Sequence, residues 1–290
     1  MGSQTVSIIC NAMTVDVEDY FQVQAFADCI DRKDWDAFPR RVDLNTNRIL
    51  DQFDVAGVKA TFFTLGWVAQ RFPDLIRRIV QDGHELASHG WDHTRVDSQD
   101  PEAFRQDIRR SRALLEDTGG VRVTGYRAAT FSMGAGTMWA FPVLRQEGYL
   151  YSSSINPIAH DLYGMPDAPR VPFRPQADGV MEIPMTTVRL GGRNWPCSGG
   201  GYFRLLPTAL YRSGLRWVNQ RERQPGIFYF HPWEVDPDQP RIPNAGWKSR
   251  LRHYTNLSRM ARDVDKLLRD FAWDRMDRVY ASVLTETTAA

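Results

Sequence analysis

The sequence predicts an α/β fold organised around a parallel β-sheet. Three observations support this: segments typical of strands and helices alternate along most of the chain, the helical segments carry one apolar face, and polar residues follow the ends of the strands. The pattern fits either a barrel or a doubly wound sheet. A chain of 290 residues is long enough for one large α/β domain, and we expect residues 1–290 to form a single domain.

Strands and helices follow one another regularly up to residue 154. The predicted strands are short apolar or β-branched runs bounded by turn residues, at 7–17, 58–65, 84–87, 121–126 and 149–152. The predicted helices have apolar residues at helical spacing between capping signals, at 43–56, 74–82, 101–117 and 136–147.

Residues 155–206 interrupt this alternation, because they contain many Pro and Gly residues and no long periodic segment. We expect an irregular insertion that covers one end of the sheet. The alternation resumes with a helix at 207–223 and a strand at 226–230, and residues 235–290 form a C-terminal extension with a helix near 257–271.

The composition argues against several classes of protein. The formal net charge is +1, from 36 Lys and Arg against 35 Asp and Glu, so no global field attracts nucleic acid or anionic lipid. The 3 Cys residues are far apart and lack C-x-x-C spacing, which argues against a disulfide scaffold or a thiolate zinc site. No run approaches the roughly 18 apolar residues of a membrane span, and the N-terminus lacks a signal-peptide pattern. We therefore expect a cytoplasmic protein with no membrane span and no nucleic-acid partner.

Four polar clusters follow predicted strands. The first, Asp16-Val17-Glu18-Asp19, ends the opening strand, where its carboxylates could hold a divalent metal and supply a general base. A solvated acidic turn would have the same sequence, so the cluster alone does not decide between the two.

The second cluster lies in GHELASHGWDH, where three residues separate His89 from His93. On a helical turn, imidazoles at this spacing face one metal ion, and two His with one carboxylate leave coordination positions for water and substrate. Chance proximity is the alternative. His84 falls inside a predicted strand, and we expect it to be a structural histidine satisfied by hydrogen bonds.

The third and fourth clusters add an arginine and a lone histidine. Arg127 ends another strand, where it could orient a carboxylate base or close a structural ion pair. In FYFHPWE, His231 follows an apolar strand, and a histidine with a pKa near neutrality suits a general acid for an amine leaving group. Parallel α/β folds gather such strand ends in one place, so the four clusters together predict one site.

The order of these motifs resembles the polysaccharide deacetylase (NodB homology, carbohydrate esterase family 4) superfamily. More narrowly, seven segments are similar to deacetylases associated with exosortase-linked exopolysaccharide loci: DVEDYFQV, ATFFTLGW, GHELASHGWDH, HDLYGMPDAPRVPF, SGGGYFRLLP, FYFHPWEVDPDQPR and RHYTNL. The resemblance extends from about Ser7 to Phe271. It implies a distorted (β/α)7 barrel with one bound divalent metal, commonly zinc, and hydrolysis of an N-acetyl amide on a hexosamine.

Position by position, the resemblance implies five roles. Asp16 would be the catalytic base, Arg127 would orient that base, and His231 would be the general acid. His89 and His93 would be metal ligands.

The carboxylate ligand of the metal stays open, because Val17 interrupts the two adjacent Asp residues of the family motif. Strand alternation puts Glu18 on the same side as Asp16, which favours Glu18. A β-bulge would instead select Asp19.

Two further positions depart from the family pattern. Ala129 stands where a Pro is usual, and Ser152 stands where an Asp that supports the catalytic histidine is expected. A hydroxyl in place of this carboxylate would lower the pKa of His231 and weaken it as an acid. Ser152→Asp would then move the alkaline limb of the pH–rate profile to higher pH, unless Asp161 or Glu182 already supplies the charge.

The predicted function is metal-dependent hydrolysis that removes N-acetyl groups from the amino sugars of a polysaccharide or oligosaccharide, with an N-acetylated glycan as partner. The scaffold could instead cut another linear amide, such as a formamido sugar on a lipid carrier or a ureide. The two departures also allow a catalytically weakened sugar-binding protein. Four aromatic residues could stack on sugar rings, although such residues lie more often in the core: Trp91, Trp195, Tyr202 and Trp233.

Overall fold

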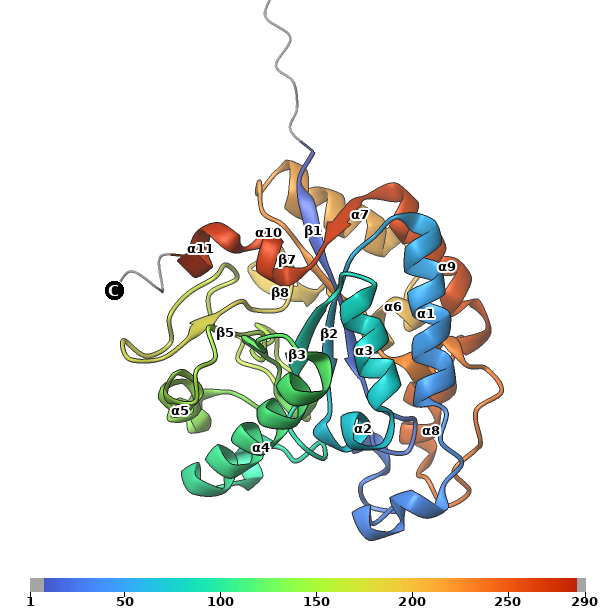
Figure 1. The fold of residues 1–290 in the computed structure, drawn as a ribbon. Helices are drawn as coiled ribbons and strands as arrows, with labels where there is room; N and C mark the ends of the chain where they lie inside the picture. Colours follow the sequence, from blue (N-terminus) through green and yellow to red (C-terminus); the bar gives the residue numbers. More distant parts are fainter. Residues whose placement is uncertain (1–7, 286–290) are drawn as a thin grey trace, which may run out of the picture.

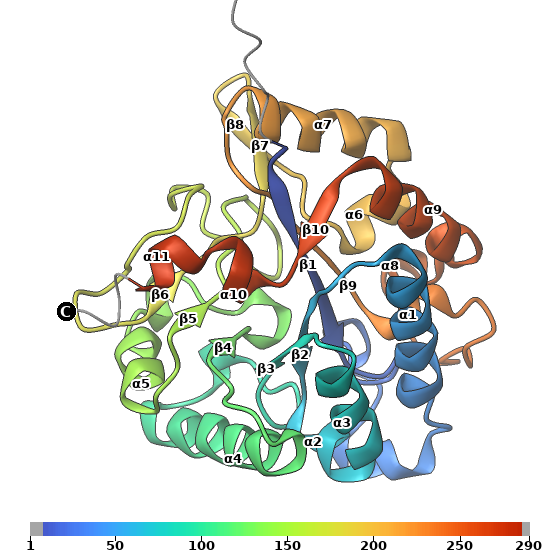
Figure 2. The same cartoon turned by 45° about the horizontal axis from the view of Figure 1, so that its top comes forward.

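A computed structural model describes residues 8–285, and its main feature is a parallel sheet curled into an incomplete barrel (Figures 1 and 2). The sheet has the order β10-β1-β2-β3-β4-β5-β6, with β9 also paired to β1, and each of these pairs is parallel. Its strands are β1 (Cys10–Val17), β2 (Thr61–Thr64), β3 (Glu85–Ser88), β4 (Gly125–Tyr126), β5 (Tyr151–Ser152), β6 (Met181–Glu182), β9 (Ile227–Phe230) and β10 (Ala272–Asp274). The prediction of an α/β barrel is confirmed.

Strand β1 is the centre of the sheet because it has three neighbours. Its first residues pair with β10, from Cys10 to Ala12, and its last residues pair with β2, from Thr14 to Val17. The pairing with β9, from Ala12 to Val15, overlaps both of these registers and must therefore use the opposite edge of β1. The end of β1 is consequently held on both sides at the point where the acidic cluster begins.

Helices cover the outside of the curled sheet (Figure 2). The longer ones match the helices predicted from the sequence to within a few residues: α1 (Val42–Ala56), α3 (Pro73–Gln81), α4 (Pro101–Gly119), α5 (Ala140–Gln146), α7 (Thr208–Gln220) and α9 (Leu257–Asp270). The caps explain their bounds. The Asp100 side chain accepts hydrogen bonds from the first backbone N–H groups of α4, and Gly120, with φ of 66°, ends it.

Two groups of buried apolar residues lie on the two sides of the sheet. The larger group fills the space between the sheet and the helices. The smaller group, which includes Phe63, Tyr151 and Met276, fills the inside of the curl. The last helices, α10 (Met276–Val279) and α11 (Ala281–Thr285), lie near the end where the strands begin (Figures 1 and 2), and Met276 N donates to Thr61 Oγ1 at 2.8 Å. The opposite end of the curl, where the strands finish, is left for the site.

The segment expected to be irregular and the C-terminal extension both contribute strands to the sheet. Residues 155–206 hold β6, the antiparallel hairpin of β7 (Thr187–Leu190) and β8 (Arg193–Pro196), and the short helix α6 (Gly200–Leu205). The C-terminal extension provides β10 and a helix, α8 (Trp247–Tyr254). These strands have two to four residues, too few for a period to be recognised in the sequence. Within the described part of the chain, no helix is both long and apolar enough to cross a bilayer.

Candidate metal centre

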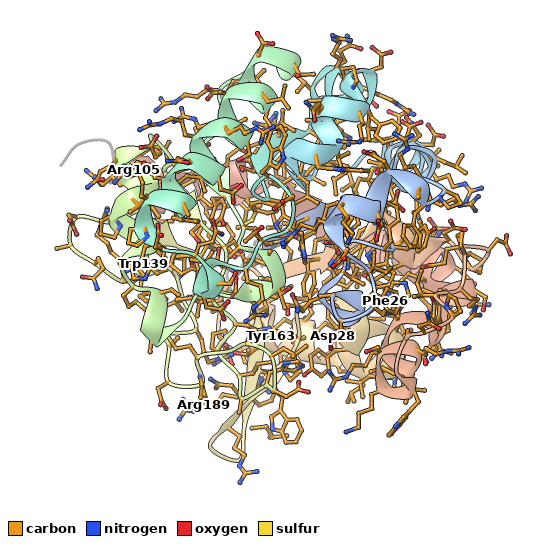
Figure 3. The ribbon with its side chains drawn as sticks, turned by 90° about the horizontal axis from the view of Figure 1, so that it is seen from below. Phe26, Asp28, Arg105, Trp139, Tyr163 and Arg189 are labelled. Atoms are coloured by element: carbon orange, nitrogen blue, oxygen red, sulfur yellow. The ribbon has the colours of Figure 1, made fainter. Side chains whose placement is uncertain are left out.

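The predicted site residues come together at the end of the barrel where the parallel strands finish. Figure 3 looks onto this end, with Tyr163 from the 155–206 segment and Phe26 from the loop after β1 labelled near its middle. Asp16 is in β1, Arg127 follows β4 directly, and His231 follows β9 directly. The carboxyl ends of β1, β4 and β9 therefore deliver these side chains to one place, as parallel α/β folds do.

Glu18, His89 and His93 form a cluster suited to a metal ion. One ligand atom from each lies within 4.8 Å of the others, and all three residues are buried. Glu18 Oε2 is 2.9 Å from His93 Nε2, yet it has no hydrogen-bond partner among the described residues. A buried carboxylate oxygen without a hydrogen bond is costly unless something else compensates its charge, and a cation would do so.

The protonation states of these ligands also fit a cation. Burial lowers the pKa of His89 to about 4, with the neighbouring His93 acting in the same direction, so His89 is neutral. Burial alone would raise the pKa of Glu18, but His93, His231 and His89 outweigh it and lower this pKa to about 2. An ionised carboxylate beside a neutral imidazole is what a divalent metal requires of its ligands.

The two histidines meet through a loop and not, as predicted, on a helical turn. Both follow β3, and the chain reverses through left-handed conformations at Gly90, with φ of 78°, and at His93, with φ of 59°. Positive φ is unfavourable for a residue with a side chain, and such strain is concentrated at functional sites. His89 Nδ1 is 2.8 Å from the backbone oxygen of Arg127, which leaves Nε2 to face the cluster.

Asp19, the other candidate carboxylate, faces away from the two histidines. Its Oδ2 accepts hydrogen bonds from Arg41 N at 2.8 Å and Val42 N at 3.0 Å, and its Oδ1 accepts from Tyr20 N at 2.9 Å. These contacts anchor the loop after β1 to the start of α1. The structure thus brings Glu18, and not Asp19, to the histidine pair, as strand alternation favours.

Asp16 and Arg127 form a buried ion pair beside the cluster. Arg127 Nη1 is 2.7 Å from Asp16 Oδ1 and also donates to Thr14 Oγ1 at 2.8 Å. The rest of the guanidinium donates to Ser153, from Nε to the backbone oxygen and from Nη2 to Oγ, both at 3.1 Å, and it lies 4.0 Å from the centre of the Phe63 ring. Arg127 is completely buried. The arginine therefore fixes Asp16 through a single contact, and Asp16 Oδ2 remains directed toward His231.

His231 lies opposite Arg127 across the acidic residues. Its Nε2 is 4.0 Å from Asp16 Oδ2 and 3.5 Å from Glu18 Oε1, while its Nδ1 is 2.9 Å from Glu234 Oε2. Burial by itself would lower the pKa of His231, but the Glu234 hydrogen bond and the carboxylates of Glu18, Glu234 and Asp16 raise it to about 9. His231 is therefore protonated at neutral pH.

Glu234 is itself held by a buried arginine. Arg204 Nε is 2.6 Å from Glu234 Oε1, and its other nitrogens donate to the backbone oxygens of Arg252, His253 and Thr255. Burial would raise the pKa of Glu234, but Arg204 and the contact with His231 lower it to about 2. Glu234 is thus an ionised support for His231.

The prediction that Ser152 leaves His231 without a supporting carboxylate is wrong. Ser152 Oγ donates to Ser154 Oγ at 2.8 Å and has no contact with His231, and Glu234 supplies the charge. Neither alternative carboxylate has this role. Asp161 pairs with Arg252 at 2.9 Å and with His160, and Glu182 accepts from the backbone N–H groups of Ser154 and Ile155.

The contact of Glu234 with His231 could have been predicted from the sequence. In FYFHPWE it comes three residues after His231, the spacing at which an acidic side chain can bond back to the first residue of a turn. The structure has this arrangement, since His231 N also donates to Glu234 Oε2 at 3.0 Å. The same short turn, Pro232–Val235, places Trp233 so that its Nε1 donates to Glu18 Oε1 at 3.3 Å.

Trp233 is not available to stack on a sugar ring, because it lies between His231 and His253, with ring centres 5.0 and 4.0 Å away. Arg110 covers the Trp91 ring at 3.3 Å from its centre. Trp195 is 55% exposed on the β7–β8 hairpin, and Tyr202 is partly buried near His160. His84 lies outside the site, and the expectation of a histidine satisfied by hydrogen bonds holds for one ring nitrogen only. Its Nδ1 accepts from Ala60 N at 3.0 Å, whereas its buried Nε2 has no hydrogen-bond partner among the described residues.

The chain is similar to known proteins over parts of its length. Residues 34–147 match the family described as polysaccharide deacetylase, and residues 153–281 match a domain of unknown function, DUF3473. The peptidoglycan-N-acetylglucosamine deacetylase PgdA of Listeria monocytogenes is 36% identical over 75 residues, which are 26% of this chain and 16% of that protein. The chitooligosaccharide deacetylase of Rhizobium leguminosarum bv. trifolii is 36% identical over 70 residues, or 24% of this chain and 33% of the relative. The chain therefore aligns with less than half the length of either relative.

Solved structures share the fold. A crystal structure from Mycobacterium smegmatis, described as a candidate polysaccharide deacetylase, has a TM-score of 0.59 at 20% identity and covers 99% of this chain and 93% of its own. A CE4 family pseudoenzyme from Bacillus anthracis has a TM-score of 0.50 at 12% identity and covers 94% of this chain and 66% of its own. Residues 34–147 therefore carry a polysaccharide deacetylase domain, and solved structures share the fold of the chain.

Proposed function

We propose that this protein is a metal-dependent hydrolase that removes N-acetyl groups from the amino sugars of a polysaccharide or oligosaccharide. The observation that carries the proposal is the cluster of Glu18, His89 and His93 beside two differently supported groups. Asp16 is fixed by Arg127, and His231, whose Nε2 is 4.0 Å from Asp16 Oδ2, is fixed by Glu234. A base and a protonated acid next to a metal site suit the hydrolysis of an amide.

The residues fit one divalent cation, and we propose zinc. Two imidazole nitrogens and one carboxylate oxygen are ligands that zinc accepts, and three protein ligands leave a coordination position open for catalysis. The unpartnered Glu18 Oε2 and the free Nε2 of His89 are the observations that support a bound cation. When bound, such a cation acidifies water and polarises a carbonyl group.

Two residues of the chain would carry out the two proton transfers of the reaction. Asp16, held by Arg127, would accept a proton from the attacking water through Oδ2. His231, protonated because Glu234 and Glu18 face it, would donate the proton on Nε2 to the departing sugar amine. The products would be acetate and a free amino sugar.

The motifs shared with exosortase-linked deacetylases support an exopolysaccharide as the natural substrate. The matched families do not test this narrower resemblance, so the polymer stays a prediction. The CE4 pseudoenzyme among the structural relatives bears on the fold alone.

Acetate release from partially acetylated chitooligosaccharides tests the proposal. Protein stripped with a chelator is assayed alone and after addition of zinc, and zinc is expected to restore release. An Asp16→Asn protein loaded in the same way serves as the control for acetate that does not come from this site. No release by the wild type with zinc, cobalt, nickel or manganese on either chitooligosaccharides or acetylated exopolysaccharide would contradict the proposal.

A further inference from the structure

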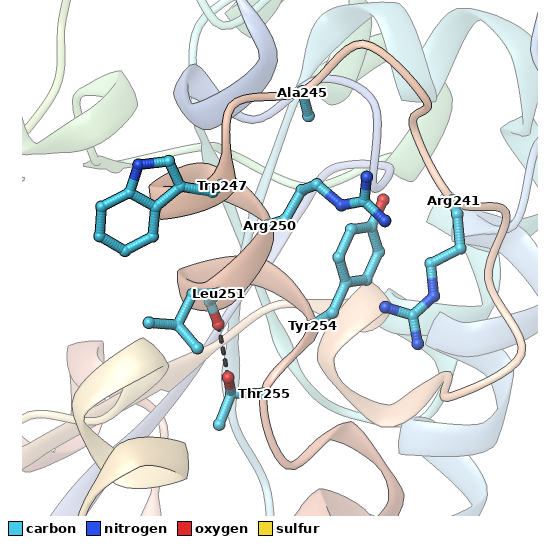
Figure 4. A pocket seen from close by; sticks show the side chains of 7 residues that line it. All are labelled: Arg241, Ala245, Trp247, Arg250, Leu251, Tyr254 and Thr255. Carbon is cyan, nitrogen blue, oxygen red and sulfur yellow. Dashed lines mark hydrogen bonds between the residues drawn. The ribbon is translucent and has the colours of Figure 1, made fainter.

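A second recess lies beside α8, on a part of the chain that the proposed chemistry does not use. It has a volume of about 720 Å³, and its lining includes Arg241, Arg250, Trp247 and Tyr254 (Figure 4). In Figure 1, α8 is at the end of the molecule where the strands finish, the end that holds the metal centre. The helix that lines the recess therefore lies at the same end of the fold as the proposed active site.

Three rings in a row, Tyr254, His253 and Trp233, connect the recess to the metal centre. Tyr254 contacts His253 with ring centres 4.7 Å apart, and His253 stacks on Trp233 at 4.0 Å. Trp233 in turn donates to Glu18 at 3.3 Å. The recess is thus linked to the metal centre through a short row of packed side chains.

The recess is cationic. None of its lining residues is acidic, and within residues 8–285 neither Arg241 nor Arg250 has an ion-pair partner within 4.0 Å. The surrounding segment, residues 239–262, contains Arg and Lys but no Asp or Glu, although the chain as a whole has a formal net charge of only +1. The positive charge is therefore concentrated here and is not a general property of the surface.

The two arginines lie beside the Tyr254 ring. The Arg241 guanidinium is 4.2 Å from the centre of the Tyr254 ring, and Figure 4 shows the Arg250 side chain extending past the same ring. Tyr254 OH is held by Ile242 N at 2.9 Å, so the ring is fixed. Trp247 is 72% exposed at the edge of the recess. Arginines that lack an acidic partner bind carboxylates and phosphates, and an exposed indole offers an apolar face to a sugar ring.

We propose that this recess is a subsite for an acidic unit of the same glycan, a sugar that carries a carboxylate such as a uronic acid. Arg241 and Arg250 bind the carboxylate, and Trp247 contacts the face of the sugar. The natural substrate is then an anionic heteropolysaccharide with both N-acetylated and acidic sugars. The role of this subsite in deacetylation rests on the proposed function. Binding of the acidic glycan can be measured without turnover.

Titration calorimetry with a heparosan octasaccharide, in which glucuronate alternates with N-acetylglucosamine, tests the subsite on zinc-loaded protein. The wild type is expected to bind it more tightly than an acetylated chitooligosaccharide of equal length. The double variant Arg241→Gln/Arg250→Gln is expected to lose affinity for heparosan about tenfold or more, because hydrogen bonds to a charged group are among the stronger ones. Its affinity for chitooligosaccharide is expected to stay the same. Raising the salt concentration should weaken only the heparosan interaction, because screening acts on the charges.

A matched control comes from the β7–β8 hairpin. Arg189 and Arg193 are exposed, and among the described side chains neither has an acidic partner within 4.0 Å. The double variant Arg189→Gln/Arg193→Gln removes the same charge away from the recess and should bind heparosan like the wild type. Equal loss in both double variants would mean a general charge effect and would overturn the subsite.

Two further outcomes overturn the inference. One is equal heparosan affinity in the wild type and in the Arg241→Gln/Arg250→Gln variant. The other is that this variant loses binding to vesicles of phosphatidylcholine and phosphatidylglycerol while its heparosan affinity is unchanged, which would assign the recess to a membrane surface. Failure of the deacetylase function would appear separately, as absent acetate release from all glycans with heparosan binding intact.

Discussion

Glu234 Oε2 lies 2.9 Å from His231 Nδ1, and Arg204 holds the other oxygen of the same carboxylate at 2.6 Å. This relationship gives His231 its charge at neutral pH. A histidine in a part-buried position would otherwise lose its proton more easily than in water. The support comes from a residue three positions along the chain, and not from the strand on which the sequence predicts it.

Glu234→Gln is expected to move the alkaline limb of the pH dependence of kcat/KM to lower pH. The acid form of His231 is needed, and its pKa of about 9 reflects burial, which lowers it, outweighed by Glu234, Glu18 and Asp16, which raise it. Removing one of the raising charges lets the proton leave at lower pH. A shift of one pH unit corresponds to about 1.4 kcal/mol, within the range of a single neighbouring charge.

The control for this experiment is Asp161→Asn, which removes a carboxylate that pairs with Arg252 and does not contact His231. Its profile should match the wild type. Because Glu234→Gln also leaves Arg204 without its partner, rates are measured below the melting temperature of the variant. Superimposable profiles for Glu234→Gln and the wild type would show that Glu234 does not set the pKa of His231.

Measurements of metal content should show that Glu18, and not Asp19, is the carboxylate ligand of the metal. Glu18→Gln, His89→Ala and His93→Ala each remove one of three ligands and are expected to lose the metal and the activity. Asp19→Asn is expected to keep the metal, because its carboxylate bonds to the backbone at the start of α1.

The same Asp19→Asn protein is expected to be less stable by about 1 kcal/mol or more, since a charged acceptor of several backbone N–H groups is lost. Elemental analysis and thermal unfolding of the purified variants make both measurements. The assignment of Glu18 as the carboxylate ligand would be reversed if the Glu18→Gln protein kept its full zinc content. It would also be reversed if, of these two variants, only Asp19→Asn lost zinc.

Asp16→Asn is expected to retain the metal and to lower kcat by about a hundredfold or more, the usual effect of removing a general base. Binding of a non-hydrolysed glycan should change little, because the amide is nearly the same size as the carboxylate. Wild-type turnover in this variant would mean that another group accepts the proton.

The effects of substituting Asp16 and Arg127 on the free energy of unfolding should be non-additive. Arg127→Met alone leaves the charge of Asp16 buried without its partner and is expected to cost about 3–5 kcal/mol in metal-free protein. Adding Asp16→Asn removes that charge, so the double variant should recover part of the loss. Denaturant unfolding of the two single variants and the double variant measures this coupling, and strictly additive effects would argue against it.

The sequence by itself determined which strand ends carry chemistry. Asp16, His89, Arg127 and His231 each follow an apolar run that can be recognised locally, and parallel strands deliver their ends to one place. The longer helices were determined in the same way, because a capping residue and an apolar face depend only on nearby positions.

Only the tertiary structure decided how those residues are supported. The choice between Glu18 and Asp19 depends on where the start of α1 lies, since the backbone of Arg41 and Val42 binds Asp19. The support of His231 depends on Arg204, which fixes the Glu234 carboxylate and is 30 residues from Glu234 in the sequence. The short strands β6 and β10 exist because their neighbours pair with them, and a segment of two or three residues has no period of its own to read. Contacts between distant segments set these features, and a single sequence does not contain the distances that create them.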